Sequence, residues 1–202
     1  MHQPVGIIYL TKLLDYWEVK ALSRKKNSKD KIIEAVCELV RNDGIAKMTM
    51  ESVAEKAGLS KGGLFYHFPT KENLIEAMLK QMFDQFDHQI NQEHEKDQLP
   101  GGTTRSYLKT TFLKYDKDEN EFVVALLAAL VNNPELLKPA KENYQNWQEQ
   151  LENDQIDPVI STIVRLATDG LWFSELFGLA PIQSELREKV FSKLNELISE
   201  AK

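Results

Sequence analysis

The chain of 202 residues is poor in the features that mark several protein classes. Its single cysteine, Cys37, cannot form an internal disulfide, and no histidine cluster accompanies it as a metal or nucleophile site would require. We expect Cys37 to be a small buried residue of a helix. No apolar run reaches the roughly 18 to 20 residues that cross a bilayer. With 42% apolar and 28% charged residues, the composition predicts a soluble globular protein of the cytoplasm.

Motifs for catalysis are also missing. We find no glycine-rich phosphate loop, no nucleophile motif and no pair of acids at a defined spacing. The cluster that most resembles a metal site of a helical bundle consists of His88, Glu93, His94, Glu95 and Asp97. Two histidines six residues apart lie on different faces of a helix, so we expect a solvated acidic helix end. We therefore expect no catalytic residue, metal or cofactor, and a helical-bundle enzyme is the less favoured alternative.

Alternation with a period of two, which would predict strands, does not extend over a useful length anywhere. Nearly every segment after residue 28 instead has apolar residues three and four apart. The pattern predicts an all-α fold with about nine helices. The expected helices cover residues 28–43, 49–57, 60–68, 71–92, 103–116, 119–133, 136–151, 158–177 and 182–199.

Local signals mark the starts of several of these helices. Ser28, Thr49 and Ser60 can cap helix N-termini, because a hydroxyl oxygen accepts a hydrogen bond from a free backbone N–H group. Asp157 followed by Pro158 predicts a further start, a capping residue followed by proline in the first turn.

Charge is distributed unevenly along the chain. Residues 1–80 hold 13 Lys and Arg against 10 Asp and Glu, a net charge of +3, whereas residues 81–202 hold 12 against 21, a net charge of −9. A basic part attached to an acidic remainder is typical of a nucleic-acid reader on a body that repels phosphate. Chance unevenness of solvated faces is the alternative.

Residues 1–28 are expected to be an N-terminal extension, part of which is not native. Trp17, Glu18 and Val19 can be encoded by a sequence that resembles a bacterial ribosome-binding site two codons before Leu22. We hypothesise that the native protein begins at Leu22, read as Met; an added helix is the alternative. The intact mass of the protein expressed from its own gene tests this.

Two short expected helices, 49–57 and 60–68, are joined by Gly58, Leu59 and Ser60, which is the pattern of a helix-turn-helix. Gly58 supplies the positive φ that such a turn needs. The second helix of this motif is the one that enters the major groove of DNA.

Gly62 and Gly63 stand in this second helix, where glycine costs about 1 kcal/mol relative to alanine. Bare backbone at these positions lets the helix approach the DNA closely, which explains why glycine is present despite its cost to helix stability. A helix of two turns is not stable by itself. We therefore expect Leu64, Phe65 and Phe68 to anchor it to a neighbouring core, with Tyr66 and His67 placed to meet phosphate.

The segment "TMESVAEKAGLSKGGLFYHFPTKENLIEAM" resembles the DNA-binding domain of the TetR/AcrR family of bacterial repressors. The matching positions are Thr49, Ala57, Gly58, Leu59, Ser60, Gly63, Phe65, Tyr66, His67, Phe68, Lys71 and Leu74. The resemblance, with the close approach at the glycine pair, implies DNA contacts by Thr49, Ser60, Lys61, Gly62, Gly63, Tyr66, His67 and Lys71. The adjacent glycines offer few base-reading side chains, which favours readout through DNA shape.

The resemblance covers about residues 29–80 and implies a three-helix helix-turn-helix domain followed by a helical ligand-binding and dimerisation domain. We expect an extension over residues 1–28, the DNA-binding domain over 29–75 and the ligand-binding domain over 76–202. The segment "LATDGLWFSELFG" also looks like a C-terminal subgroup of such regulators.

A regulator of this kind reads a palindrome as a homodimer, because two recognition helices multiply the discrimination of one. The last two expected helices are the candidates for the dimer interface, although ordinary core positions are the alternative. The candidate residues are Val164, Leu171, Phe177, Leu186, Val190, Leu194 and Leu197.

Large apolar side chains of the second domain are candidates for an effector pocket, since such pockets are mostly apolar. They are Met82, Phe86, Tyr107, Phe112, Leu126, Leu130, Trp147, Trp172 and Phe173. Few charges lie among them, which favours a small hydrophobic effector; plain core is the alternative for each. The expected function is a repressor that binds a palindromic double-stranded operator and is released by this effector. A constitutive or activating DNA-binding regulator without an effector remains the alternative.

Overall fold

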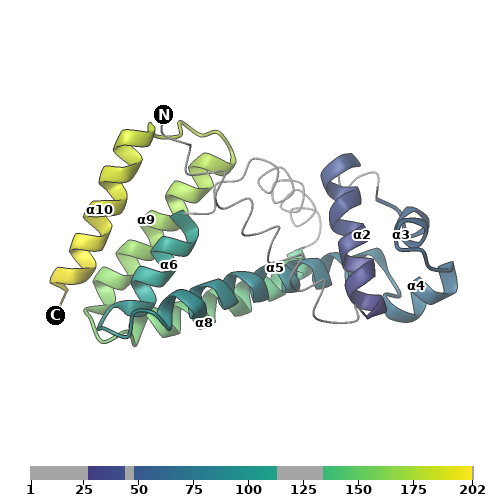
Figure 1. Ribbon diagram of the computed structural model, residues 1–202, viewed down its shortest axis with the longest axis horizontal. Helices are drawn as coiled ribbons and strands as arrows, with labels where there is room; N and C mark the ends of the chain where they lie inside the picture. Colours follow the sequence, from purple (N-terminus) through teal and green to yellow (C-terminus); the bar gives the residue numbers. More distant parts are fainter. Residues whose placement is uncertain (1–26, 44–47, 113–133, 202) are drawn as a thin grey trace. The chain divides into compact units, whose positions relative to one another are not determined.

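The computed structural model describes residues 27–43, 48–112 and 134–201. All regular structure in these ranges is helical, with no strand, so the all-α fold class is confirmed. Figure 1 shows the elements, which are α2 (Ser28–Asp43), α3 (Met50–Lys56), α4 (Lys61–His67), α5 (Lys71–His94), α6 (Gly102–Phe112), the 3-10 helix η1 (Pro134–Leu137), α8 (Lys138–Glu152), α9 (Pro158–Leu176) and α10 (Ser184–Glu200).

Some expectations lie outside these ranges. They are the extension with its start at Leu22, the expected helix over residues 119–133, and the pocket candidates Leu126 and Leu130. Within the described ranges, none of the helices has the length and apolar character that would carry it across a membrane.

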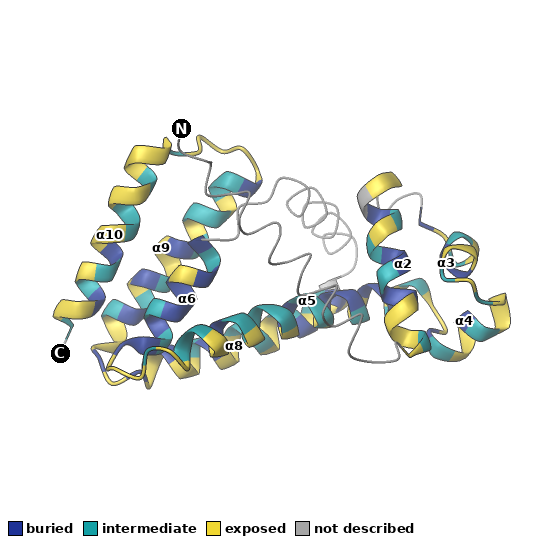
Figure 2. Ribbon diagram, in the orientation of Figure 1, coloured by how far each residue is buried: buried dark blue, intermediate teal, exposed yellow. Residues whose placement is uncertain are grey.

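The described residues form two compact units, 27–43 with 48–78 and 79–112 with 134–201. In the first unit α2 packs on α3, and α3 packs on α4. Apolar residues three and four apart on α2, among them Ile32, Val36 and Val40, are buried in its core. Figure 2 shows this buried side of α2 in dark blue.

In the second unit α9 is the central helix. It packs against α6 and α8, while α10 contacts both α6 and α9. The core between α6, α9 and α10 consists of Leu108, Phe112, Ile156, Val164, Leu194 and Ile198.

Most of the expected helix starts are confirmed. Thr49, Ser60 and Asp157 each accept a hydrogen bond from a backbone N–H group of the helix that they begin. The expectation for Ser28 was wrong by one residue. Asn27 caps α2, because its Oδ1 accepts from the N–H group of Asp30 at 3.0 Å while Asp30 Oδ2 accepts from the Asn27 N–H group at 3.3 Å.

Asp154, in the connection between α8 and α9, fixes the start of α6. Its carboxylate is buried and accepts from the N–H groups of Thr103 at 3.0 Å and Thr104 at 2.7 Å. Gly101 precedes these residues at φ +80°, and a Cβ atom there would lie 2.6 Å from Ile198. The conformation and the crowding both require glycine at this turn.

Candidate nucleic-acid interface

The first unit contains a helix-turn-helix built from α3 and α4, each of seven residues. Thr49 and Ser52 form a capping box at the start of α3, each side-chain oxygen accepting from the other residue's N–H group at 3.1 Å. Ser60 Oγ accepts from the Gly63 N–H group at 3.1 Å and so begins α4. Between them Gly58 has φ +66°, the left-handed conformation expected of this turn.

The two faces of α4 differ sharply. Leu64 and Phe68, four residues apart, are buried in the first unit as expected. The expectation that Phe65 is also an anchor is wrong, because 37% of its surface is exposed. In a helix residues four apart share a face, so Phe65 lies with Lys61 along the edge of the buried face, while Gly62 and Tyr66 lie on the side opposite the buried pair.

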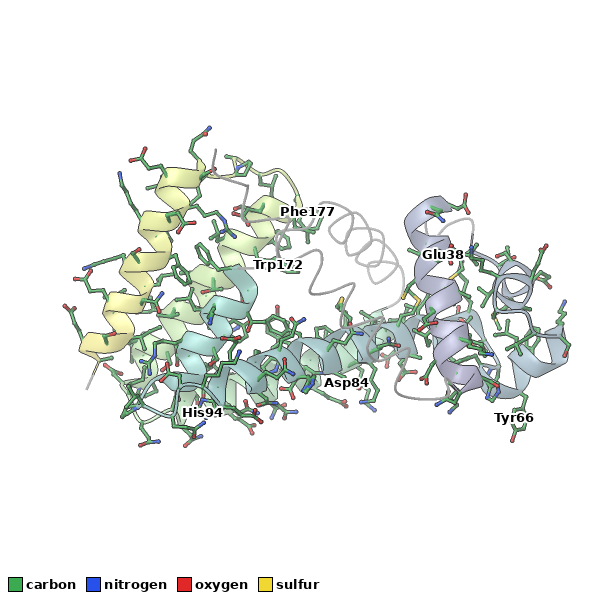
Figure 3. The ribbon with its side chains drawn as sticks, in the orientation of Figure 1. Glu38, Tyr66, Asp84, His94, Trp172 and Phe177 are labelled. Carbon is green, nitrogen blue, oxygen red and sulfur yellow. The ribbon has the colours of Figure 1, made fainter. Side chains whose placement is uncertain are left out.

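We define the outer face of α4 as Lys61, Gly62, Phe65 and Tyr66, all of which are exposed. Tyr66 exposes 85% of its surface, and Figure 3 shows its side chain directed away from the rest of the first unit. The Tyr66 and His67 rings meet edge to face, with centroids 5.2 Å apart. The outer face therefore combines a cation, bare backbone and aromatic rings.

The two adjacent glycines have different surroundings. A Cβ atom at Gly62 would meet no atom within 4 Å, whereas one at Gly63 would lie 3.3 Å from Ser60 Oγ. Neither residue is buried. Packing within the protein thus gives no reason for glycine at position 62, so the open space there is available to a partner.

The polar groups expected to contact DNA also make contacts within the first unit. Lys61 Nζ lies 2.5 Å from Glu51 Oε1 of α3, and this hydrogen bond lowers the pKa of the Glu51 carboxyl below its usual value. Lys71 Nζ donates to the Met48 carbonyl oxygen at 2.8 Å, which ties the start of α5 to the segment before α3. Thr49, Ser60, Lys61, Gly62 and Tyr66 are exposed. Gly63, His67 and Lys71 are partly exposed.

In the second unit, three expected pocket residues come together. The ring centroids of Phe86, Tyr107 and Trp147 lie 4.9 to 5.9 Å apart. Phe83 and Tyr144, which the sequence analysis missed, complete this aromatic cluster by contacting Trp147. Both lie three residues from an expected member on the same helix, Phe83 from Phe86 and Tyr144 from Trp147, a helical spacing that could have identified them.

Charged groups border the aromatic cluster, contrary to the expected scarcity of charge. The Tyr107 hydroxyl donates to Asp169 Oδ1 at 2.6 Å, and Arg165 Nη1 lies 3.1 Å from Asp169 Oδ2. Burial raises the pKa of the Asp169 carboxyl and raises the pKa of Tyr144 to about 12. The Tyr107 hydroxyl is therefore a hydrogen-bond donor held in place by a partly buried carboxylate.

The other pocket candidates lie apart from this cluster or at its margin. Phe112 packs on Phe191 with ring centroids 4.8 Å apart and lies 4.2 Å below the Arg187 guanidinium, so it belongs to the core beneath α10. Phe173 contacts Phe177 and is exposed, while Met82 and Trp172 are partly buried. The candidates thus do not form one site.

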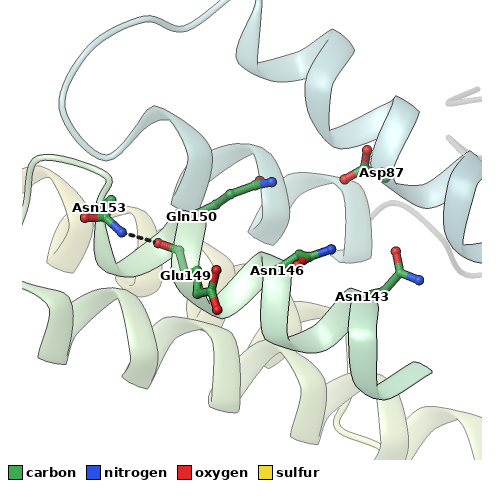
Figure 4. Close-up of a pocket in the computed structure, with 6 residues that line it drawn as sticks. All are labelled: Asp87, Asn143, Asn146, Glu149, Gln150 and Asn153. Atoms are coloured by element: carbon green, nitrogen blue, oxygen red, sulfur yellow. Dashed lines mark hydrogen bonds between the residues drawn. The ribbon is translucent and has the colours of Figure 1, made fainter. Parts of the chain in front are cut away.

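A separate polar groove of about 440 Å³ lies along α8 in the second unit. Figure 4 shows the lining residues, which are Asp87, Asn143, Asn146, Glu149, Gln150 and Asn153. None of the expected pocket residues lines it. Across the described part of the chain, no group of three or more His, Cys, Asp or Glu residues is arranged to hold a metal ion.

Two expected dimer contacts are corrected by the structure. Val164 and Leu194 are buried in the core between α6, α9 and α10, where no surface remains for a partner. Leu171, Val190 and Leu197 pack partly against the same core, whereas Phe177 and Leu186 are exposed. Of the expected dimer residues, therefore, only Phe177 and Leu186 are exposed, and the surfaces that α9 and α10 present to solvent consist mostly of other residues.

An apolar stripe runs along the side of α9 that faces away from the core around Val164. Figure 2 shows exposed positions along this helix in yellow. The outer stripe of α9 consists of Val159, Ile163, Leu166, Gly170, Phe173 and Phe177, successively three or four residues apart. Its five side chains expose between 39% and 61% of their surface. A stripe of this kind marks an interaction surface.

Two regions of the chain match models of one protein family. Residues 32–78 match the model for bacterial regulatory proteins of the tetR family, and residues 101–199 match the tetracyclin repressor-like C-terminal domain. Together they cover more than half of the chain.

Similar proteins agree with these matches. The nucleoid occlusion factor SlmA of Aliivibrio fischeri is 33% identical over 82 residues, 39% of this chain and 42% of that protein. The HTH-type transcriptional regulator TtgR of Pseudomonas putida is 30% identical over 88 residues, 43% of this chain and 42% of that protein. The chain thus spans less than half the length of these relatives.

A solved structure extends the likeness of fold over most of the chain. The multidrug binding protein EbrR in complex with ethidium superimposes with a TM-score of 0.65 at 24% identity. The match covers 83% of this chain and 98% of that one.

Proposed function

Since the chain belongs to the TetR family of DNA-binding transcriptional regulators, which are not enzymes, we propose that it is a cytoplasmic repressor. It binds a palindromic operator as a homodimer and leaves the operator when a small molecule binds. Residues 29–75 carry the DNA contacts, and residues 76–202 carry the effector site and the dimer interface.

The observation that supports DNA binding most strongly is the outer face of α4. Gly62 leaves the backbone bare with no packing reason within the protein, and Lys61 and Tyr66 flank it with groups suited to a duplex. Leu64 and Phe68 hold the helix from the other side, so it can enter a groove without unfolding. Thr49, Ser60, Gly63, His67 and Lys71 are proposed to surround this face as further contacts.

The outer stripe of α9 supports a homodimer in which a second copy covers it. A twofold axis pairs the same patch on both copies, so one self-complementary apolar stripe is sufficient. From position 159 to 177 the stripe is about 27 Å long, and Gly170 lets two helices approach closely. Leu186 on α10 is exposed and is proposed to extend the interface.

The aromatic cluster of the second unit supports an effector site for a hydrophobic molecule. A ligand that inserts among Phe86 and the buried rings of Tyr107 and Trp147 would meet ring faces and edges, and the Tyr107–Asp169 pair would add a fixed polar group for orientation. The likeness in fold to a multidrug binding protein that holds ethidium favours a planar aromatic effector.

Helix α5 is proposed to transmit the effect of the ligand. It begins at Lys71, beside the helix-turn-helix, and carries Phe86 of the proposed effector site, with Met82 one turn before it. A ligand that moves these side chains would shift α5 and change the spacing of the two recognition helices. Coupling of about 1 to 3 kcal/mol would lower operator affinity about 5- to 150-fold.

Selection of bound DNA from a random pool tests the proposal. We expect an enriched palindrome whose half-sites are one helical turn or a multiple of it apart. Recovery of no preferred sequence would contradict operator binding, and a single half-site would contradict the dimer.

Effector release is tested separately with the selected operator. Planar aromatic compounds that raise the thermal stability of the protein are added to the operator complex, and we expect them to weaken binding. Stabilisation without any change in affinity would favour the constitutive alternative.

A further inference from the structure

We infer that Phe65 reads sequence directly, by placing its ring against the 5-methyl group of a thymine in the major groove. The inference rests on the proposed DNA-binding function and assigns a role to a residue that was expected from the sequence only to anchor the short helix. The outcomes described below separate its failure from the failure of that function.

The position of Phe65 is the first step. Its neighbours Leu64 and Phe68 bury their side chains, so the core beneath α4 is already filled by apolar groups from the inner face. Phe65 is not needed there and exposes 37% of its surface on the outer face. The exposed part of this ring is therefore available for contact with a partner of α4.

The neighbours on the outer face are the second step. Gly62 lies one turn before Phe65 on the same face, and no atom occupies the space around it. The Lys61 ammonium lies over the Phe65 ring, 5.8 Å from its centroid, within the range of a cation–π contact. The ring thus lies beside an open strip of backbone, where the floor of the groove can reach it.

The chemistry of the groove is the third step. Base edges in the major groove present hydrogen-bond donors and acceptors, and the thymine methyl is the apolar group among them. Phenylalanine has neither donor nor acceptor. Against the other base edges the ring would remove water from polar atoms without replacing their hydrogen bonds, which is costly. Phe65 therefore discriminates in favour of thymine.

The test uses the operator obtained from the selection above. Each thymine is replaced in turn by deoxyuridine in both half-sites, which removes only the methyl group. The dissociation constant is measured by fluorescence anisotropy for the wild type and for Phe65→Ala. At one thymine of each half-site we expect deoxyuridine to weaken wild-type binding about 15-fold, because a buried methyl group contributes about 0.8 kcal/mol and the two half-sites together about 1.6 kcal/mol.

The double-mutant cycle decides the assignment. For Phe65→Ala we expect that same deoxyuridine to change affinity less than twofold, while Tyr66→Ala, on the same face, keeps the full deoxyuridine effect. Phe65→Leu retains an apolar side chain and should keep part of the deoxyuridine effect. This variant replaces Phe65→Ala in the cycle if circular dichroism shows that the alanine variant is unfolded. Equal deoxyuridine effects in wild type and Phe65→Ala would overturn the inference, as would no effect at any thymine. Failure of the wild type to select any DNA would instead contradict the proposed function.

Discussion

Helices α4 and α9 both expose apolar side chains, but they do so in different chemical settings. On α4 the exposed Phe65 stands among Lys61, Gly62 and Tyr66, over only two turns. On α9 the outer stripe extends over the whole helix and contains no charged residue. The charged residues of α9 are all partly buried and paired elsewhere, Arg165 with Asp169 and Glu175 with Arg187.

This difference separates two kinds of partner. A duplex is polar and anionic, so a surface that meets it needs cations and close backbone approach with few apolar groups. A second copy of a helix offers apolar side chains, so an uncharged stripe of matching spacing is sufficient. Exposure of apolar surface alone does not distinguish the two; the neighbouring residues do.

Substitutions in each of the two helices test this difference between their partners. The largest effect is expected for substitutions in α9. The double variant Leu166→Glu with Phe173→Glu places four like charges at the proposed twofold interface. We expect dimerisation to weaken more than 1000-fold, since like-charge contacts cost several kcal/mol and about 4 kcal/mol corresponds to that factor. Light scattering after gel filtration measures it, with Gln150→Glu on α8 as the matched control. A double variant that remains dimeric would refute the assignment of the stripe.

The inner and outer faces of α4 should differ in stability. Leu64→Ala removes a fully buried side chain, and we expect the free energy of unfolding to fall by about 3 kcal/mol. Phe65→Ala on the outer face should cost less than about 1 kcal/mol. Urea denaturation followed by circular dichroism compares the two. A larger loss for Phe65→Ala would restore its role as an anchor.

Gly62→Ala should have opposite effects on stability and on binding. The helix gains about 1 kcal/mol because alanine has the higher helix propensity and its Cβ meets nothing in the protein. Operator affinity should fall about tenfold, since the same methyl group holds the backbone away from the duplex. Thermal unfolding and anisotropy measure the two quantities, and Gln145→Ala, at an exposed position of α8 outside the proposed DNA and dimer surfaces, serves as the control for DNA binding. Undiminished affinity in Gly62→Ala would remove the main support for the interface.

The smallest effect is expected for Glu51→Gln. The pKa of Glu51 is lowered mainly by its hydrogen bond with Lys61, so Glu51 is ionised at neutral pH and carries a negative charge beside the outer face of α4. Its neutral replacement should raise DNA affinity about two- to threefold and steepen the dependence on salt. The difference between variant and wild type should shrink only as the pH falls through the lowered pKa of Glu51, below the usual value for a glutamate, because Glu51 itself then becomes protonated. An affinity that falls would show that Glu51 positions Lys61 productively.

Features set by neighbouring residues could be predicted from the sequence. The caps at Thr49, Ser60 and Asp157 and the left-handed turn at Gly58 depend on groups within three residues of each other, and the structure has them. Spacing along a helix also identified Leu64 and Phe68 as buried. It did not identify the Asp154 cap of α6, whose partners lie about 50 residues away.

The choice between two apolar faces could not be predicted in this way. Val164 and Leu194 belong to helices with the same apolar spacing as the outer stripe, but tertiary packing places these two residues in the core. Phe65 was expected to be buried because it is aromatic. It is exposed because Leu64 and Phe68 already fill the contact between α4 and the core of the first unit.

The amino-acid sequence by itself determined that this protein is helical, where its helices begin, and that a helix-turn-helix carries two glycines in its second helix. These properties follow from local backbone preferences and from hydrogen bonds between near neighbours. Tertiary structure decided which apolar residues face solvent, which rings gather around Trp147, and which charged groups pair. Those outcomes depend on contacts between helices distant in the chain, and a periodic pattern fixes the faces of a helix without fixing what each face meets.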